Sequence, residues 1–373
     1  MKRNYHIDCL RAAATYGVIL WHCFSPVYYQ FGPVQEWAAA NIMFGFAIRW
    51  SVAVFVMISG ALLLDREEPV TSFYRKRLVR ICIPLLTWTM VYGLSRLYYF
   101  KVYTYDHHPK PDFWVFMYGQ YKDLLNDRLS YHLYFVSIIL GLYIITPFVA
   151  RMMRGLGEKE LRMFVMIGAG VYSLRFFFPN GLILDHFELG SYFVYFILGH
   201  YLYKYPPKGS PRLLIYAGSV VAAILMTWLN YRTEYTMKGH QDTVYRTDGP
   251  FVYMLSIAIF VLFGHLIGEA KKGLPGAKPG FLKRSMRRLV LAVSNNSYGI
   301  YIAHPLLISY LIYGTFESFS FSTARAAFVL FGYKVIITMN NSWGAVVQSM
   351  LMMAILLLFF YLVRLLRLQR YFT

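Results

Sequence analysis

The sequence is poor in charged residues, and acidic residues are the scarcest. Only 15% of its 373 residues are charged, and 18 Asp and Glu stand against 37 Lys and Arg. A chain of which 58% is hydrophobic and 19% aromatic does not have enough polar residues to cover a water-exposed surface. The composition therefore excludes a water-soluble protein and predicts a polytopic membrane protein.

Cysteine is also scarce. Cys9, Cys23 and Cys82 all lie in or beside apolar segments, and their spacing fits neither a disulfide framework nor a metal site. We therefore predict no metal. The chain also lacks low-complexity segments, a composition break that would mark a soluble domain, and a convincing internal repeat. These absences disfavour transporters built from inverted repeats and predict a single transmembrane domain over residues 1–373.

Long apolar segments are abundant. A helix needs about 20 mostly apolar residues to cross a bilayer core, and about ten segments approach this length. We expect an all-α protein with about ten transmembrane helices, near residues 7–24, 38–64, 81–100, 133–149, 163–178, 187–203, 213–230, 250–268, 290–313 and 343–363.

The distribution of basic residues predicts the topology. A net charge of +19 would suit a nucleic-acid partner, but most Lys and Arg lie between apolar segments on alternate sides. Cytoplasmic loops of membrane proteins carry this excess. We therefore expect both termini in the cytoplasm and no nucleic-acid partner. The longer acidic and aromatic loops, 101–132 and 231–249, are expected outside.

The first apolar segment holds two ionisable residues, Arg11 and His22. Eleven positions on a helix return two side chains to within about 20° of one face, about 16 Å apart along the axis. Ionisable groups inside a span are costly and are functional candidates, so the pair predicts an anion site at one end and chemistry at the other. The alternative is that Arg11 marks the membrane edge and His22 is a packed, hydrogen-bonded residue.

A second basic cluster precedes the third predicted span. Arg77 and Arg80 are three positions apart and so are neighbours on a helix. Guanidinium groups match phosphate oxygens better than point charges do. Together with Arg11 they predict a pocket for a phosphorylated cytoplasmic cofactor. The alternative is a basic cluster that only fixes the orientation of the helix.

The ninth predicted span carries a polar stripe. Ser297, Tyr301 and His304 follow an i, i+4, i+7 pattern, and Pro305 comes next. A proline is tolerated inside a span where a cavity or a neighbouring helix satisfies the freed backbone groups. The stripe therefore predicts either the lining of a substrate path or hydrogen bonds between helices.

These motifs resemble those of the acyltransferase 3 family of integral membrane acyltransferases. Arg11 and His22, within His6-Ile-Asp-Cys-Leu-Arg-Ala12, match its motif of arginine, ten residues and histidine. Val54-Phe-Val-Met-Ile-Ser-Gly60, which includes Ser59, resembles its serine–glycine signature in the second span. Arg77 and Arg80 resemble its paired-arginine motif.

Two further stretches extend the resemblance along the chain. His132-Leu-Tyr-Phe135, followed by Gly141-Leu-Tyr143 and Pro147, is similar to the fourth-span pattern of the branch that includes enterobacterial common antigen O-acetyltransferases. Tyr134 replaces a tryptophan that is frequent there, which conserves the aromatic character. Ser297-Tyr-Gly-Ile-Tyr-Ile-Ala-His304 resembles a late-span motif. The motifs occur in the family's order over nearly the whole chain.

The resemblance implies an enzyme that moves a small acyl group from cytoplasmic acyl-coenzyme A to a hydroxyl of an extracytoplasmic glycan or lipid-linked saccharide. We expect acetyl as the acyl group, with succinyl as the alternative. The expected location is the bacterial cytoplasmic membrane, as a multi-pass protein among membrane lipids; the oligomeric state is left open. A glycan or lipid transporter without acyl-transfer chemistry is the alternative from a different class.

The resemblance also implies roles for individual residues. Arg11, Arg77 and Arg80 would bind the phosphates of the donor. His22 would act as general base or as a transient acyl acceptor. The substrate path and the surroundings of His22 are expected to include Ser59, His132, Ser297, Tyr301 and His304.

Overall fold

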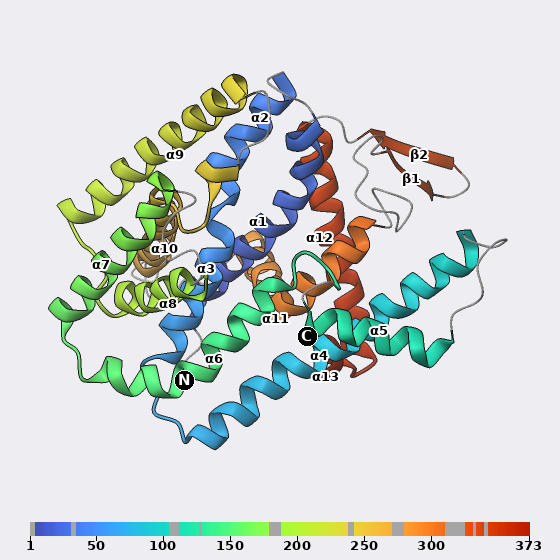
Figure 1. The fold of residues 1–373 in the computed structure, drawn as a ribbon, viewed down its shortest axis with the longest axis horizontal. Coiled ribbons are helices and arrows are strands. Elements are labelled where there is room, and N and C mark those ends of the chain that lie inside the picture. Colours follow the sequence, from blue (N-terminus) through green and yellow to red (C-terminus); the bar gives the residue numbers. More distant parts are fainter. Residues whose placement is uncertain are drawn as a thin grey trace.

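A computed structural model of the chain describes most of its residues. The described ranges are 4–30, 35–103, 112–126, 129–178, 188–237, 242–270, 280–309, 325–330, 333–338 and 342–373. Almost all of these residues are helical (Figure 1).

In chain order, the helices of the described residues are α1 (Tyr5–Gln30), α2 (Gln35–Met43), the π-helix η1 (Phe44–Ile48), α3 (Trp50–Leu63), α4 (Val70–Tyr103), α5 (Phe113–Leu125), α6 (Tyr134–Arg154), α7 (Glu158–Phe177), α8 (Glu188–Lys204), α9 (Ser210–Met237), the 3₁₀-helix η3 (Asp242–Tyr245), α10 (Pro250–Ala270), α11 (Phe281–Ile308), α12 (Ser342–Leu365) and α13 (Gln369–Phe372).

Helix α1 is at the centre of the bundle. It packs against α11, α12, α3, α2 and α10, and Figure 1 shows it enclosed by them. Its core-facing side chains, among them Leu10, Ala14 and Cys23, are fully or almost fully buried. The helix that carries Arg11 and His22 is therefore surrounded by protein, as expected for an ionisable pair that faces an interior site.

The outer surface of the bundle is apolar. Side chains more than half exposed include Phe148, Met166, Leu214 and Leu358, which belong to four different helices. A water-soluble protein would not present so much apolar surface all around. Among the described residues, six helical segments are long and apolar enough to cross a membrane: Glu36–Leu63, Val70–Leu97, Tyr134–Arg154, Ser210–Glu234, Pro250–Ile267 and Ser342–Leu365. The protein is thus a multi-pass membrane protein.

The predicted spans all coincide with helices of the structure. Four of these helices, α1, α7, α8 and α11, are not among the six segments that meet the criteria of length and composition. Residues 310–313, the end of the ninth predicted span, lie outside the described residues. About ten crossings, and cytoplasmic positions for both termini, stay predictions.

Several boundaries differ from the sequence analysis. Helix α4 begins at Val70, directly after Pro69, so the basic cluster with Arg77 and Arg80 is already helical. The predicted loop 101–132 contains α5, which Asp112 caps by accepting hydrogen bonds from the backbone N–H groups of Trp114 and Val115 at 2.9 and 3.0 Å. The basic start of α4 and the short helix α5 lack the long apolar run that marks a span, so the hydrophobic pattern alone did not reveal them.

A small antiparallel hairpin is the one described departure from helix. Strands β1 (Arg325–Leu330) and β2 (Tyr333–Thr338) pair between α11 and α12, with Arg325 opposite Thr338. The hairpin lies at the edge of the bundle (Figure 1). It adds to the predicted all-α fold without entering the helical core.

Helices α3 and α8 make the closest helix contact around the site. A Cβ at Gly60 would collide with the backbone carbonyl of Phe196, and a Cβ at Gly199 with that of Met57. Membrane helices approach this closely only where small residues face each other. The close packing of α3 against α8 therefore requires the glycine of the serine–glycine signature, Gly60. The same packing holds the neighbouring Ser59 in place.

Candidate functional site

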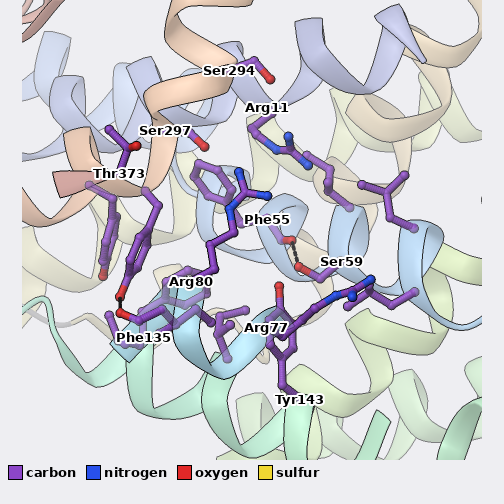
Figure 2. A pocket seen from close by; sticks show the side chains of 18 of the residues that line it. Arg11, Phe55, Ser59, Arg77, Arg80, Phe135, Tyr143, Ser294, Ser297 and Thr373 are labelled. Carbon is purple, nitrogen blue, oxygen red and sulfur yellow. Dashed lines mark hydrogen bonds between the residues drawn. The ribbon is translucent and has the colours of Figure 1, made fainter. Parts of the chain in front are cut away.

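A cavity of about 470 Å³ opens between α1, α3, α4, α6 and α11. Its lining includes six of the nine site residues predicted from the sequence, namely Arg11, Ser59, Arg77, Arg80, Ser297 and Tyr301. Figure 2 shows the three arginines projecting into this space from two helices, α1 and α4. Residues that are far apart in the sequence thus meet at one site.

Apolar side chains form much of the remaining wall. Phe55 from α3, Phe135 and Tyr143 from α6, and Ile81 from α4 are the main ones. The Ser59 hydroxyl donates to the backbone carbonyl of Phe55 at 3.1 Å (Figure 2). A cavity with a cluster of cations beside an apolar wall suits a ligand with an anionic part and a slender apolar part.

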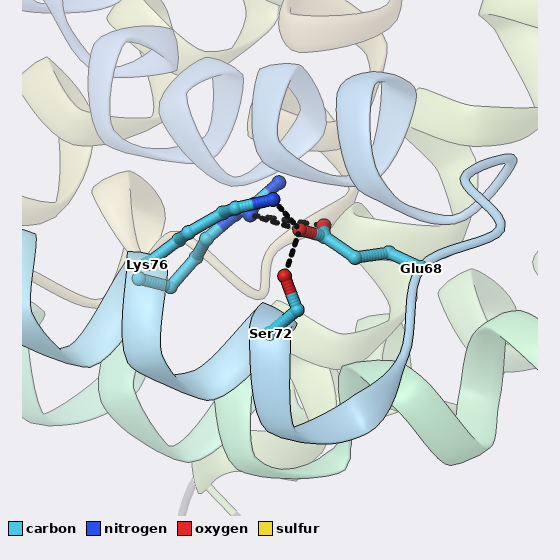
Figure 3. Close-up of polar contacts among 4 residues, drawn as sticks. Glu68, Ser72 and Lys76 are labelled. Atoms are coloured by element: carbon cyan, nitrogen blue, oxygen red, sulfur yellow. Dashed lines mark hydrogen bonds and ion pairs between the residues drawn. The ribbon is translucent and has the colours of Figure 1, made fainter.

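Arg77 is held by a carboxylate at the rim of the cavity. Its guanidinium lies 3.0 Å from Glu68 Oε2, and Lys76 Nζ lies 2.8 Å from Glu68 Oε1. Ser72 also donates to this carboxylate, at 3.4 Å (Figure 3). The hydrogen bond from Lys76 and the nearby charge of Arg77 lower the pKa of Glu68 below its usual value. Glu68 is therefore a carboxylate that already pairs with two of the cations at the site, Lys76 and Arg77.

Arg80 is different. It is exposed, lines the cavity, and forms no ion pair with any described acidic residue. It lies one turn further along α4 than Arg77, on the side that Figure 2 shows turned toward Arg11. A guanidinium without a carboxylate partner can offer its full fork to an incoming anion.

Hydrogen bonds between helices hold the walls together. Ser294 of α11 lines the cavity and donates to the buried carboxylate of Asp8 in α1 at 2.7 Å. The Tyr298 hydroxyl donates to the backbone carbonyl of Ile81 in α4 at 3.0 Å. These bonds fix the register of α11 against both helices that carry the arginines.

The other three predicted site residues form a separate cluster. The ring centroids of His22 and His304 are 5.0 Å apart, and those of His132 and His304 are 5.4 Å apart. The three rings come from α1, from the turn before α6, and from α11. His304 and His132 are buried, whereas His22 is partly exposed.

The hydrogen bonds of His304 define its tautomer. Its Nδ1 lies 2.6 Å from the carbonyl oxygen of Tyr301, which can only accept, so Nδ1 carries the proton in the neutral ring. Its Nε2 is buried and has no partner among the described residues. The Nε2 of His132 is also buried without a partner among the described residues. The Nδ1 of His132 shares a hydrogen bond of 2.8 Å with the Ser130 hydroxyl. Two acceptor or donor positions are therefore open beside His22.

Tyr301 joins the histidine cluster to the arginine cavity. It lines the cavity, its ring lies 5.5 Å from that of His132, and its hydroxyl donates to the backbone carbonyl of His132. His22 itself does not line the cavity. The arginine cavity and the histidine cluster that contains His22 are therefore neighbours, and Tyr301 contacts both.

Sequence reasoning missed two groups of residues at this site. Glu68 and Lys76 gave no motif of their own, because Glu68 lies in the connection before α4 and Lys76 lies within the helix. Tyr131, whose hydroxyl lies 3.3 Å from His22 Nδ1, gave no signal beyond its position next to His132.

Arg49 was missed for a different reason. Its guanidinium stacks on the ring of Trp21, next to His22, at 3.5 Å from the ring centroid. Arg49 directly follows the π-helix η1, a type of distortion that occurs frequently at functional sites. Such a distortion cannot be seen in a hydrophobic pattern. In the described part of the chain, no group of three or more His, Cys, Asp or Glu side chains is arranged to hold a metal ion.

Comparison with known proteins gives one match. The sequence profile of the acyltransferase 3 family, described as an acyltransferase domain, matches residues 4–364. No curated protein and no solved structure matches the chain. The match spans α1 to α12 and so includes the arginine cavity and the histidine cluster. The chain therefore belongs to the acyltransferase 3 family of integral membrane acyltransferases.

Proposed function

We propose that this acyltransferase moves an acetyl group from cytoplasmic acyl-coenzyme A to a hydroxyl of an extracytoplasmic glycan or lipid-linked saccharide. The observation that carries the proposal is the arginine cavity, which Tyr301 connects to the three-histidine cluster. Coenzyme A combines charged phosphates with a slender arm that ends in a thioester. The cavity combines Arg11, Arg77 and Arg80 with apolar walls, which is the matching chemistry.

The donor would lie with its phosphates at the arginines and its arm along the apolar wall. Phosphates are far too costly to place inside the hydrocarbon core, so they stay at the arginine end. The thioester would then pass Tyr301 and reach His22. A succinyl group would need a further cation near the thioester; Arg49, stacked on Trp21 beside His22, leaves this alternative open.

His22 would act as the general base. Its Nε2 can take a proton only if Nδ1 carries one, and the Tyr131 hydroxyl oxygen is placed to accept from Nδ1. The acceptor hydroxyl loses its proton to Nε2 as its oxygen attacks the thioester carbonyl. The C–S bond then breaks, and the thiolate leaves with the proton that His22 had taken. In the other route Nε2 attacks the thioester carbonyl and the C–S bond breaks, so that the thiolate leaves an acyl-imidazolium. The acceptor hydroxyl then attacks the acyl carbon, the N–C bond breaks to restore His22, and the proton of the hydroxyl passes to the thiolate.

Purified protein supplied with acetyl-coenzyme A and candidate saccharides tests the activity. We expect release of free coenzyme A thiol that depends on the saccharide, measured with a thiol reagent. Succinyl-coenzyme A in parallel decides between the two acyl groups. A transporter without chemistry would move saccharide and release no thiol, so the absence of thiol release in every combination would favour the transporter.

Oriented vesicles test the sidedness. Acetyl-coenzyme A supplied only at the face that carries Arg77 and Arg80 should acylate an acceptor confined to the opposite face. The reason is that neither polar reactant crosses the bilayer, so each needs its own opening. Transfer that occurs only with both reactants on one face would contradict the extracytoplasmic acceptor and leave the acyl transfer itself in place.

Arg80→Lys should weaken acyl-coenzyme A binding about tenfold although it keeps the charge. Lys cannot reproduce the planar fork that binds two phosphate oxygens at once. Titration calorimetry with acetyl-coenzyme A measures the change. Arg284→Lys, an exposed substitution outside the cavity, is the control. Equal affinity of Arg80→Lys and wild type would assign the basic cluster to membrane orientation alone.

Glu68→Gln should tighten acyl-coenzyme A binding by up to about fivefold. In the structure the carboxylate pairs with Lys76 and Arg77 and must give them up to the phosphates of the donor. Removal of its charge removes a competitor worth about 1 kcal/mol. Its neighbour Glu67, which is well exposed, gives a matched control as Glu67→Gln. Weaker binding by Glu68→Gln would mean that Glu68 positions the two cations for the donor.

A further inference from the structure

A second cavity lies beside the first one. Its volume is about 690 Å³, and six residues of α4 between Thr71 and Arg80 line it together with Arg370 and Thr373. Lys76, Arg80 and Thr373 line both cavities. The two cavities are therefore neighbours along one stretch of α4.

The helix geometry of α4 explains how one helix serves both cavities. Successive side chains point about 100° apart around the axis. Arg75 and Val79 therefore point in nearly the same direction, into the second cavity, and Arg77 and Ile81 point into the first. Lys76 and Arg80 lie between these two directions, which is why they reach both.

The second cavity is strongly basic. Its side chains include Arg75, Lys76, Arg80 and Arg370, and none of the lining side chains is acidic. Among the described residues, neither Arg75 nor Arg370 takes part in an ion pair, and both are exposed. Only Lys76 is engaged, by Glu68. The cavity thus presents the guanidinium groups of Arg75, Arg80 and Arg370, with which no acidic side chain of the described residues forms an ion pair.

We propose that this second cavity binds the nucleotide end of acyl-coenzyme A, with its 3′-phosphate on Arg75 and Arg370. The inference rests on the proposed function and extends it to a second subsite. Coenzyme A carries negative charge in two places, the diphosphate and the ribose 3′-phosphate. A site for coenzyme A therefore needs one set of cations for each of these groups. Arg11 and Arg77 of the first cavity form one set, and Arg75 and Arg370 of the second cavity form the other. Lys76 and Arg80, which line both cavities, lie between the two sets.

The remaining lining suits the base and the ribose. Val79 is exposed within the cavity and offers an apolar surface to a purine ring, and a guanidinium group can stack on that ring. The hydroxyl groups of Thr71 and Ser72 can bond with ribose oxygens. The phosphate of an anionic lipid headgroup would bind the same guanidinium groups, but it would not need the surfaces for the purine and the ribose.

Coenzyme A and 3′-dephospho-coenzyme A, which differ only in this phosphate, test the assignment. Binding is measured by calorimetry with the full chain in nanodiscs of neutral phosphatidylcholine. We expect wild type to bind coenzyme A about tenfold more tightly than the dephospho form. Arg75→Gln and Arg370→Gln should each weaken coenzyme A binding about tenfold, as for the loss of a charged hydrogen bond, and change dephospho-coenzyme A binding less than twofold.

Arg364→Gln is the matched control, because Arg364 is also exposed near the end of the chain but lines neither cavity. It should change neither affinity. Equal losses for the two ligands in the Arg75 and Arg370 variants would overturn the assignment, and so would a wild type that does not distinguish them.

A lipid occupant has its own signature. Phosphatidylglycerol in the nanodiscs would then inhibit coenzyme A binding to wild type but not to Arg75→Gln, and this variant would bind both nucleotides as wild type does. That result would make the second cavity a lipid site, and the proposal would be wrong. If wild type binds no coenzyme A at all, the proposed function fails together with the inference. If wild type transfers the acyl group but binds coenzyme A and 3′-dephospho-coenzyme A equally well, the inference is wrong and the proposed function stands.

Discussion

His22→Ala should lower acyl transfer by about 100- to 10,000-fold, the usual contribution of a general base, while the protein remains folded in the membrane. His22 is partly exposed inside the bundle and shares one long hydrogen bond, 3.3 Å, with Tyr131. Its removal therefore costs little packing or hydrogen bonding. The loss should appear in kcat, with the affinity for acetyl-coenzyme A nearly unchanged, because the arginines that bind the phosphates lie in the adjoining cavity.

Two further variants make this prediction specific. His22→Gln keeps a polar side chain of similar size but no base, and it should be as inactive as His22→Ala. His265→Gln changes a histidine of α10 that is paired with Arg212 at 2.6 Å, outside the cluster, and it should retain activity. Near-normal turnover by both His22 variants would contradict the catalytic assignment. Loss of coenzyme A binding together with turnover would indicate a structural role.

The histidine cluster shows what a linear motif can and cannot predict. The spacing of Arg11 and His22 on one helix predicts an anion site and a chemical site at different depths, and both roles stay predictions. It could not predict that Tyr301 would link the arginine cavity to the histidine cluster, because that contact depends on how α11 packs against the turn before α6. His132 and His304 were recognised as candidates by their motifs. Their approach to His22 follows from tertiary packing alone.

The basic cluster of α4 shows a similar limit. The three-residue spacing predicted that Arg77 and Arg80 would be neighbours, and both line one cavity. The sequence offered no sign that Glu68 would pair with Arg77 and not with Arg80. The carboxylate comes from the connection between α3 and α4, whose path depends on the packing of both helices. Charges of opposite sign near each other in a sequence do not determine which of them pair.

The apolar segments were the most predictable part of the fold. Where the structure describes them, they overlap helices, because apolar runs of this length have few other solutions in a bilayer. Their ends were less predictable. Helix α4 continues well beyond the apolar run on its basic side, and α5 forms in a region that was expected to be a loop. Both depend on local signals, the proline before Val70 and the Asp112 cap, which are weaker than hydrophobicity.

Gly60→Ala should destabilise the protein more than any other single methyl group added near the site. The new Cβ would collide with the backbone carbonyl of Phe196, and a backbone atom cannot move aside as a side chain can. Helices α3 and α8 would have to separate. Overpacking of this kind costs about 1–3 kcal/mol, and for a chain of 373 residues we expect the midpoint of thermal unfolding to fall by about 1–4 °C. Gly199→Ala should behave in the same way, because its Cβ would meet the backbone of Met57.

The control is a glycine whose surroundings are open. Nothing lies within 4 Å of a Cβ built at Gly170, in the interior of α7. Gly170→Ala should therefore leave the midpoint unchanged or raise it, since alanine favours helix by about 1 kcal/mol. Because Gly60 adjoins Ser59, separation of α3 from α8 should also displace one wall of the arginine cavity and weaken acetyl-coenzyme A binding. A Gly60→Ala protein as stable as the Gly170→Ala protein would show that α3 and α8 do not touch at these glycines.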